Sequence, residues 1–405
     1  MLKSGGAVIH MQLNFNELEY VIGSPEIVEK MQHIKVFQPF DDRILEFFNA
    51  LSSKLRVNRE YSDVATFGFW CRKAALTIEK NKYDDIAVRL GKGIIFHSTP
   101  SNVAVNFAFS FAAGMLAGNA NIVRLPGKPY AQVDIICQAI KELLVGDYAD
   151  MIPYICFVKF PPKKEITDVF SSICNVRVIW GGDGTVGELR QSPIQARTTE
   201  ITFADRHSIA VIDADEYLKL DNKDKVAVDF YNDTYFSDQN ACTSPRIIFW
   251  KGNDISLAKN EFWGRVQKLV DEKYNMAPVQ SVGKLNALYK VASQKNVRKE
   301  LDDNMLIVRV EIESLDDDLM KYKYNSGFFY EFNIKSLDEI VPVCDIRCQT
   351  LTYIGLNDTE IKNFLKETRT RGIDRVVPMG KSMDFTLIWD GYDLIRQMSR
   401  RINVI

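Results

Sequence analysis

Short runs of β-branched and aromatic residues alternate with longer amphipathic segments through most of the chain. In one such segment Val133, Ile136, Ile140 and Leu144 recur at the spacing of a helix face, between Pro129 and Gly146. Alternating strands and helices predict an α/β fold with a parallel sheet. We expect strands at 93–97, 121–125, 154–160, 175–180, 208–212, 246–250, 306–312, 327–333 and 349–355. We expect helices at 42–55, 63–80, 163–172, 257–273 and 358–371, the last of which ends before Gly372. A further helix should begin near residue 103, and another should run from Pro129, as its first residue, to Gly146.

The composition is that of an ordinary globular protein. The 405 residues are 46% hydrophobic and 26% charged, which excludes a disordered or fibrous chain and suits two or three domains. The 51 basic and 53 acidic residues nearly cancel, so nucleic-acid binding is not expected. The seven cysteines are odd in number and scattered, which indicates a reducing, cytoplasmic location.

No segment has the pattern of a secretory signal or a membrane span. Residues 1–11 contain one lysine and no apolar core long enough for a signal peptide. Residues 103–118 are the most apolar stretch, but a span needs roughly 20 apolar residues, and this one includes Asn106 and Ser110. We therefore expect a buried helix there.

A glycine-rich loop follows the strand expected at 175–180. Gly182, Gly184 and Gly187 match the pattern G-x-G-x-x-G, and a helical segment comes after them. Glycines at these positions let a turn approach a phosphate closely. The motif lies in mid-chain and Pro193 shortens the helix, so a plain tight turn remains the alternative to a phosphate or cofactor loop.

Cys242 differs from the other cysteines in its surroundings. It lies among polar, turn-forming residues at 236–245, whereas the other six have the pattern of small core residues. A free thiol is only a few per cent thiolate at neutral pH, so a nucleophile here needs help from a cation or a helix end.

The histidines do not suggest a metal site. The chain has four, at positions 10, 33, 97 and 207, and none has metal-ligand spacing to a second ligand. Cys344 and Cys348 have no second pair, so zinc is not expected. A cysteine–histidine hydrolase stays open, because such groups assemble in space rather than in sequence.

Several ordered segments together resemble the aldehyde dehydrogenase superfamily, and more closely its LuxC-like acyl-CoA reductase branch, the fatty-acid reductases of bioluminescence systems. The resemblance covers roughly residues 85–405. Arg124 departs from the superfamily, which has a lysine that touches the cofactor ribose at this position. The segments that carry the resemblance are 93–102, 116–124, 180–187, 199–201, 204–208, 238–245, 372–381 and 384–392.

The resemblance implies roles for individual side chains. Cys242 would be the nucleophile, and Asn102 would support the oxyanion together with the Cys242 backbone N–H. Glu200 aligns with the superfamily's general base, although Thr202 and Phe203 replace the two glycines that follow it there. Glu200 either assists proton transfer or is a structural carboxylate. The cofactor-binding residues would be Thr99, Arg124, Lys128, Gly182, Asp183 and Gly187.

The implied reaction is reduction of an acyl thioester to an aldehyde through a thioester on Cys242. NADPH is expected over NADH, because Arg124 and Lys128 flank Gly127, near the position that often carries an acidic residue. The family suggests a long acyl chain, and the aromatic residues at 328–332 either line a tunnel for it or are strand core. The alternatives are a short-chain acylating aldehyde dehydrogenase that uses NAD and coenzyme A, and a non-redox acyl carrier or acyltransferase subunit.

The resemblance also assigns the domains. Residues 1–210 would form N-terminal helices and a dinucleotide-binding domain, and 211–380 the catalytic domain with the thiol. Residues 381–405 would return to the cofactor domain or to a subunit interface. The implied partners are acyl-CoA or an acyl-protein donor, an acyl-protein synthetase or acyltransferase, and further copies of the chain in a homo-oligomer.

Overall fold

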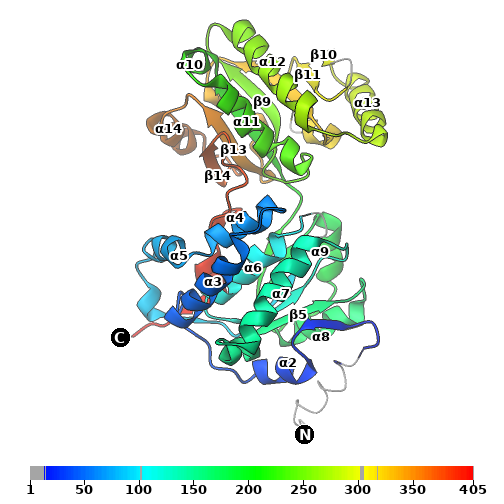
Figure 1. Cartoon of the computed structure of the whole chain (residues 1–405). Helices are drawn as coiled ribbons and strands as arrows, with labels where there is room; N and C mark the ends of the chain where they lie inside the picture. Colours follow the sequence, from blue (N-terminus) through cyan, green and yellow to red (C-terminus); the bar gives the residue numbers. More distant parts are fainter. Residues whose placement is uncertain (1–12, 14, 101–102, 302–304, 317, 405) are drawn as a thin grey trace. The chain divides into compact units, whose positions relative to one another are not determined.

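The computed structural model describes residues 13, 15–100, 103–301, 305–316 and 318–404 and divides into two compact units (Figure 1). The first comprises residues 1–204 and 386–405, and the second 205–385. The boundary expected near 210 would cut strand β8 (His207–Asp213) in two. That strand is hydrogen-bonded along its length to β9 and β13, so it belongs as a whole to the second unit.

The first unit is built on a six-stranded sheet in the order β1-β5-β4-β3-β6-β7. Five of its strands, β5, β4, β3, β6 and β7, run parallel to one another, as predicted. β1 pairs antiparallel with β5 at the edge. α6 and α7 follow β3 and β4, and α8 packs on the face that carries Phe96. The bounds are β1 (Glu19–Ile22), β3 (Ile94–Ser98), β4 (Ala120–Arg124), β5 (Ile155–Lys159), β6 (Val176–Trp180), β7 (Thr199–Phe203), α6 (Asn106–Leu116), α7 (Ala131–Val145), α8 (Lys164–Ile173) and α9 (Asp183–Leu189).

The direction of the chain reverses in the middle of this sheet. From β3 the chain moves through α6 to β4 on one side, and from β6 it moves through α9 to β7 on the other. β3 and β6 are neighbours, so the region outside their carboxyl ends is a topological switch point. Open parallel sheets bind ligands at this position.

Three expected helix boundaries differ from those in the structure. The helix expected at 63–80 is two helices, α4 (Ser62–Trp70) and α5 (Lys73–Lys80). The break occurs because Arg72, with φ −58° and ψ 136°, is not helical, and the Lys73 N–H donates to the Asn49 side chain on α3 (Asp42–Leu55) at 3.1 Å. α7 starts at Ala131 rather than at Pro129. α14 (Asp358–Thr368) ends before Arg369, which adopts a left-handed conformation, rather than at Gly372.

The second unit contains a seven-stranded sheet in the order β10-β11-β12-β9-β8-β13-β14. Only β10 runs antiparallel to its neighbour among the described strands of this sheet. α11 and α12 cover one face, and α13 and α14 the other (Figure 1). The bounds are β9 (Pro245–Lys251), β10 (Val297–Leu301), β11 (Val308–Ile312), β12 (Phe328–Ile334), β13 (Cys348–Ile354), β14 (Arg375–Pro378), α10 (Ala214–Lys219), α11 (Lys223–Asp233), α12 (Ile255–Lys273) and α13 (Pro278–Ala292).

The aromatic residues of β12 are core residues rather than a tunnel lining. Phe328 and Tyr330 pack into the cluster on one face of the sheet, and Phe329 into the cluster on the other. All three are almost completely buried, as expected for a central strand whose side chains alternate between two covered faces.

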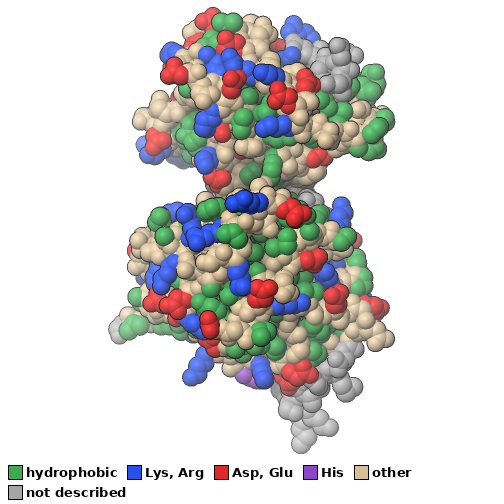
Figure 2. All heavy atoms as spheres, viewed as in Figure 1, with side chains coloured by type: hydrophobic (Ala, Val, Ile, Leu, Met, Phe, Trp, Pro, Cys, Tyr) green, Lys and Arg blue, Asp and Glu red, His purple; other side chains and the backbone are tan. Residues whose placement is uncertain are grey.

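The C-terminal segment 386–405 belongs to the first unit. Its strand β17 (Ser399–Arg401) pairs antiparallel with β2 (Arg89–Gly91), and the Asn119 side chain donates to the Met398 carbonyl at 3.0 Å. Acidic and basic side chains are mixed over the visible face of each unit (Figure 2). No helix among the described residues is long and apolar enough to cross a membrane.

Candidate active site

The expected cofactor residues of the first unit lie at the carboxyl edge of its sheet. β3 ends at Ser98, which is in register with Arg124 on β4 and with Ile179 on β6. Thr99, Arg124 and the loop after Trp180 therefore come together at the switch point. We call this region, residues 99, 124–128 and 181–187, the carboxyl edge.

The glycine loop at the carboxyl edge has an unobstructed backbone. A Cβ added at Gly182, Gly184 or Gly187 would meet no atom within 4 Å, whereas one at Gly181 would meet Thr185 at 2.9 Å. Packing inside the protein therefore does not require glycine at these three positions. The open backbone suits a loop that must let a bulky, charged group approach, as a nicotinamide dinucleotide requires.

The two basic residues at this edge differ in how they are engaged. The Arg124 guanidinium lies 4.5 Å from the centre of the Phe160 ring and donates to the Phe160 carbonyl at 3.2 Å. Burial lowers the pKa of Arg124. The Thr99 hydroxyl donates to the Arg124 carbonyl at 2.5 Å, so both residues are used in holding this edge together. Lys128 is exposed. The prediction of NADPH from positive charge near the 2′-phosphate therefore depends mainly on Lys128.

A buried polar chain that the sequence analysis did not identify supports the same edge. The Trp180 indole donates to Ser110 at 3.0 Å, and Ser110 and Asn121 flank the two ring nitrogens of His97 at 2.8 and 2.9 Å. Burial lowers the pKa of His97 to about 4, so the ring is neutral at physiological pH. Trp180 also stacks on Phe203, with ring centres 3.7 Å apart. His97 thus has a structural environment rather than a metal-binding or acid–base one.

Glu200 lies away from the carboxyl edge, within β7, where it is paired with Arg177 on β6. Its Oε2 accepts from Arg177 Nε at 2.9 Å and Nη2 at 2.5 Å, and its Oε1 from Arg190 at 2.7 Å. Burial opposes ionisation of Glu200, but the two guanidinium groups outweigh it and lower the pKa. A carboxylate with both oxygens held in this way is a weak base. Asn102, the expected oxyanion donor, lies outside the described residues.

Cys242 belongs to the second unit, at the amino end of β9. Of the seven cysteines, all within the described residues, it alone is partly exposed. Burial raises the pKa of most of the others, for Cys137 and Cys174 to about 12, so those thiols are unreactive core groups. Ser208 on β8 donates to the Cys242 carbonyl at 2.7 Å. We call residues 237–245 the thiol loop.

The thiol loop is held by a buried glutamine that the sequence analysis gave no role. Gln239 is completely buried, and its side chain makes four hydrogen bonds to backbone groups. It donates to the Pro245 and Phe328 carbonyls at 3.1 and 3.2 Å and accepts from the Gly327 and Phe328 N–H groups at 2.9 and 3.2 Å. Asp238 and Gln239 both have positive φ, 52° and 56°, so the loop adopts an uncommon conformation that these bonds maintain.

Arg246 places a buried positive charge behind this loop. Its guanidinium donates to the Gln239 carbonyl, to the Tyr324 carbonyl at 2.7 Å and to Asn325 at 2.7 Å. Burial lowers the pKa of Arg246 to about 10, and Asp205 and Cys242 are among the groups that oppose this effect electrostatically. Arg246 thus interacts electrostatically with Cys242, and a positive charge near a thiol favours the thiolate, which is the nucleophilic form. Among the described residues, no three His, Cys, Asp or Glu side chains converge as a metal site.

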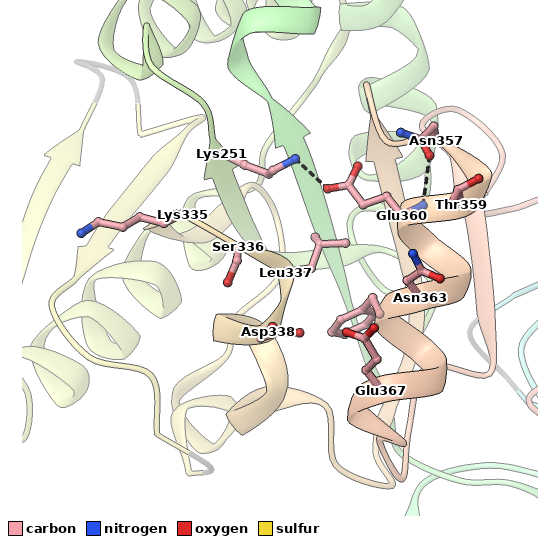
Figure 3. Close-up of a pocket in the computed structure, with 11 residues that line it drawn as sticks. Lys251, Lys335, Ser336, Leu337, Asp338, Asn357, Thr359, Glu360, Asn363 and Glu367 are labelled. Carbon is pink, nitrogen blue, oxygen red and sulfur yellow. Dashed lines mark hydrogen bonds and ion pairs between the residues drawn. The ribbon is translucent and has the colours of Figure 1, made fainter.

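A pocket of about 470 Å³ lies at the opposite edge of the same sheet (Figure 3). Lys251, the last residue of β9, pairs there with Glu360 at 2.6 Å. β9 spans seven residues, so this pocket is about 20 Å from the thiol loop at its other end. The pocket is therefore separate from the thiol loop. Its lining comes from the end of β9, the segment after β12, and α14.

Comparisons with known proteins place these features in a family. A family model described as acyl-CoA reductase (LuxC) matches residues 72–401, more than half of the chain. Among curated proteins, no sequence matches this chain.

Solved structures show the same aldehyde-dehydrogenase-like α/β fold at low identity. Lactaldehyde dehydrogenase from Escherichia coli aligns with a TM-score of 0.62 and 10% identity over 92% of this chain and 87% of that one. An oxidoreductase from Marinobacter aquaeolei gives 0.65 and 10% over 93% and 90% of the two chains. An NAD-dependent benzaldehyde dehydrogenase from Corynebacterium glutamicum gives 0.62 and 13% over 96% and 94%.

Proposed function

Because this chain belongs to the LuxC family of acyl-CoA reductases, we propose that it reduces an acyl thioester to an aldehyde through a thioester on Cys242, with NADPH as reductant. The observation that carries the proposal is the contrast among the cysteines. Cys242 is partly exposed in a rigidly held polar loop in front of a buried arginine, whereas the other six are buried. A nucleophilic thiol needs both access and a nearby positive charge.

In the first step the Cys242 thiolate attacks the carbonyl carbon of the acyl thioester. The carbon–sulfur bond to coenzyme A breaks, the coenzyme A thiolate leaves, and the acyl group remains on Cys242. The carbonyl oxygen is negative during the attack, and the resemblance to the aldehyde dehydrogenase superfamily implies the Cys242 backbone N–H and Asn102 as its donors. Losing one such donor typically costs about 10²- to 10³-fold in rate.

The second step releases the aldehyde. When bound, a reduced nicotinamide would supply the hydride that the thioester carbon accepts in this step. The carbon–sulfur bond to Cys242 then breaks, and the thiolate is regenerated. A hydrolytic enzyme needs a base to activate water against the acyl group, whereas a reductase must exclude water. The ion-paired environment of Glu200 therefore favours a structural carboxylate over a general base.

We assign the cofactor to the carboxyl edge of the first unit. The open glycine backbone at 182–187 and the switch-point position support this assignment. Lys128, exposed beside Gly127, favours a 2′-phosphate and hence NADPH. The long-chain acyl substrate is inferred from the family, because the aromatic residues of β12 form core and supply no tunnel. A homo-oligomer and an acyl-donating partner enzyme are proposed on the same basis.

The test is a series of short-, medium- and long-chain acyl-CoA substrates assayed with NADPH and with NADH. We expect aldehyde formation, with long chains and NADPH preferred. Equal catalytic efficiency with the two cofactors would contradict the cofactor assignment. Preference for short chains with NAD and coenzyme A in the oxidative direction would identify an acylating aldehyde dehydrogenase instead.

Substitution of the thiol tests the covalent step. Cys242→Ala should lower the rate by at least about 10³-fold, because no thioester can form. Cys137→Ala is the matched control, since that thiol is buried on α7 and should not affect activity. A normal rate in Cys242→Ala would end the covalent hypothesis. Acyl label retained on Cys242 without nicotinamide binding would indicate a non-redox acyl carrier.

A further inference from the structure

A segment far from Cys242 in sequence reaches the thiol loop. Residues 379–385, here called the return loop, follow β14 and lead the chain out of the second unit. Thr243, the residue after Cys242, is buried and donates its hydroxyl to the sulfur of Met383 in this loop at 3.2 Å. The position of the return loop is thus coupled directly to the residue beside the thiol.

A basic side chain holds the return loop from one side. Arg375, on β14, donates to the carbonyls of Ser382 at 2.6 Å, Lys381 at 3.0 Å and Asp384 at 2.6 Å. These three carbonyls surround Met383 in sequence. A guanidinium can make such a set of bonds because its donors are fixed in one plane.

An acidic side chain holds the same loop from the other side. Asp233, the last residue of α11, is 1% exposed, and its carboxylate accepts from the Gly380 N–H at 2.6 Å and from the Ser382 N–H at 3.0 Å. Gly380 has a φ of +89°, and a Cβ there would lie 2.6 Å from the Cβ of Asp229. The loop is therefore seated closely against α11, and only glycine fits at the point of contact.

We propose that Asp233 and Arg375 act as positioning residues for catalysis, since they fix the return loop and, through the Met383–Thr243 contact, the thiol loop that carries Cys242. This inference rests on the proposed function for its catalytic meaning. Asp233, Arg375 and the return loop that they hold, here called the clamp, all lie in the second unit. Ionised Asp233 accepts two N–H bonds, whereas a protonated carboxyl would direct its own O–H against one of them.

The hydrogen bonds of the clamp depend on pH, because Asp233 accepts them in its ionised form. Burial raises the pKa of Asp233 to about 6, and Asp229 on the same helix adds to the effect. Lys381 on the return loop is paired with Asp384 at 3.0 Å and interacts electrostatically with both helix carboxylates. Protonation below about pH 6 weakens the clamp. The pKa of Asp233 is higher in the folded state than its ordinary value. Protonation of Asp233 therefore raises the free energy of unfolding as the pH falls, even though it weakens the hydrogen bonds to the return loop. Activity should fall on the acid side without a parallel loss of stability from this group.

The experiment compares Asp233→Asn with wild type in the full chain between pH 5 and 8. We expect kcat/KM at neutral pH to fall about 10- to 100-fold, which is the effect of a slightly misplaced catalytic group. We also expect the acid limb of the pH profile, the decrease of kcat/KM near pH 6, to disappear. Asp224→Asn, an exposed position on the same helix, is the control and should keep wild-type values. An unchanged kcat/KM and an unchanged acid limb in Asp233→Asn would overturn the proposal.

A second readout does not depend on reductase activity. We expect iodoacetamide to alkylate Cys242 at least about twofold faster in Asp233→Asn and in Arg375→Lys than in wild type, since a released loop exposes the thiol. Arg375→Lys keeps the charge and loses the simultaneous bonds to three carbonyls. Alkylation rates equal to wild type in both variants would refute the clamp. Absence of reductase activity in wild type would instead refute the proposed function.

Discussion

The carboxyl edge of the first sheet and the thiol loop at the amino edge of the second are held in opposite ways. At the carboxyl edge, Gly182, Gly184 and Gly187 are exposed and have no neighbours that demand glycine. In the thiol loop, two consecutive residues have positive φ, and a buried glutamine makes four bonds to backbone groups. The difference suits their proposed tasks, because a cofactor loop must accept a large ligand, whereas a nucleophile must be held in one orientation.

This contrast predicts that the thiol loop tolerates substitutions less well than the carboxyl edge does. Gln239→Leu removes the partners of two N–H groups and two carbonyls that are buried around it. We expect a loss of about 3–5 kcal/mol in the free energy of unfolding, together with most of the activity. Urea denaturation measures the first and the aldehyde-forming assay the second. Gln294→Leu, an exposed glutamine in the same unit, should change stability little, and equal stabilities of the two variants would break the comparison.

A smaller effect is expected for the ion pair on β7. Glu200→Gln leaves the buried Arg177 guanidinium without a full counter-charge, which should cost about 2 kcal/mol of unfolding free energy, because Glu200 remains partly open to solvent. Its pKa is lowered in the folded state, so the stabilisation is present above the ordinary value of 4.5 and is lost as the pH falls further. The stability difference between wild type and variant should therefore narrow below about pH 4.5. A large loss of kcat with little change in stability would instead assign Glu200 to catalysis.

The smallest effect on stability should come from the carboxyl edge. Gly184 lies inside α9, and an alanine Cβ there meets no atom, so Gly184→Ala should change stability by less than about 1 kcal/mol, in the stabilising direction. We expect the KM for NADPH to rise, because the methyl group occupies space assigned to the cofactor. Thermal unfolding and initial-rate kinetics separate the two effects. An unchanged KM would remove this loop from the cofactor site.

Much of the fold could be predicted from the chain because it depends on local patterns. Apolar runs and amphipathic segments located most of the strands within one or two residues, and their alternation predicted the parallel sheets that are observed. The polar residues that flank Cys242 in the chain also distinguish it from the other six cysteines, since burial follows composition over a few neighbouring positions.

The partners of individual polar side chains were decided only by the tertiary structure. Arg124 and Lys128 are both basic residues near Gly127 in the sequence. Arg124 packs on Phe160, which directly follows the neighbouring strand β5, while Lys128 is exposed. Gln239 meets Phe328, and Asp233 meets Ser382, across separations of 89 and 149 residues. Strand and helix periodicity reports which face of an element is buried, but it carries no information about which distant backbone groups will lie within hydrogen-bonding distance once the sheets have assembled.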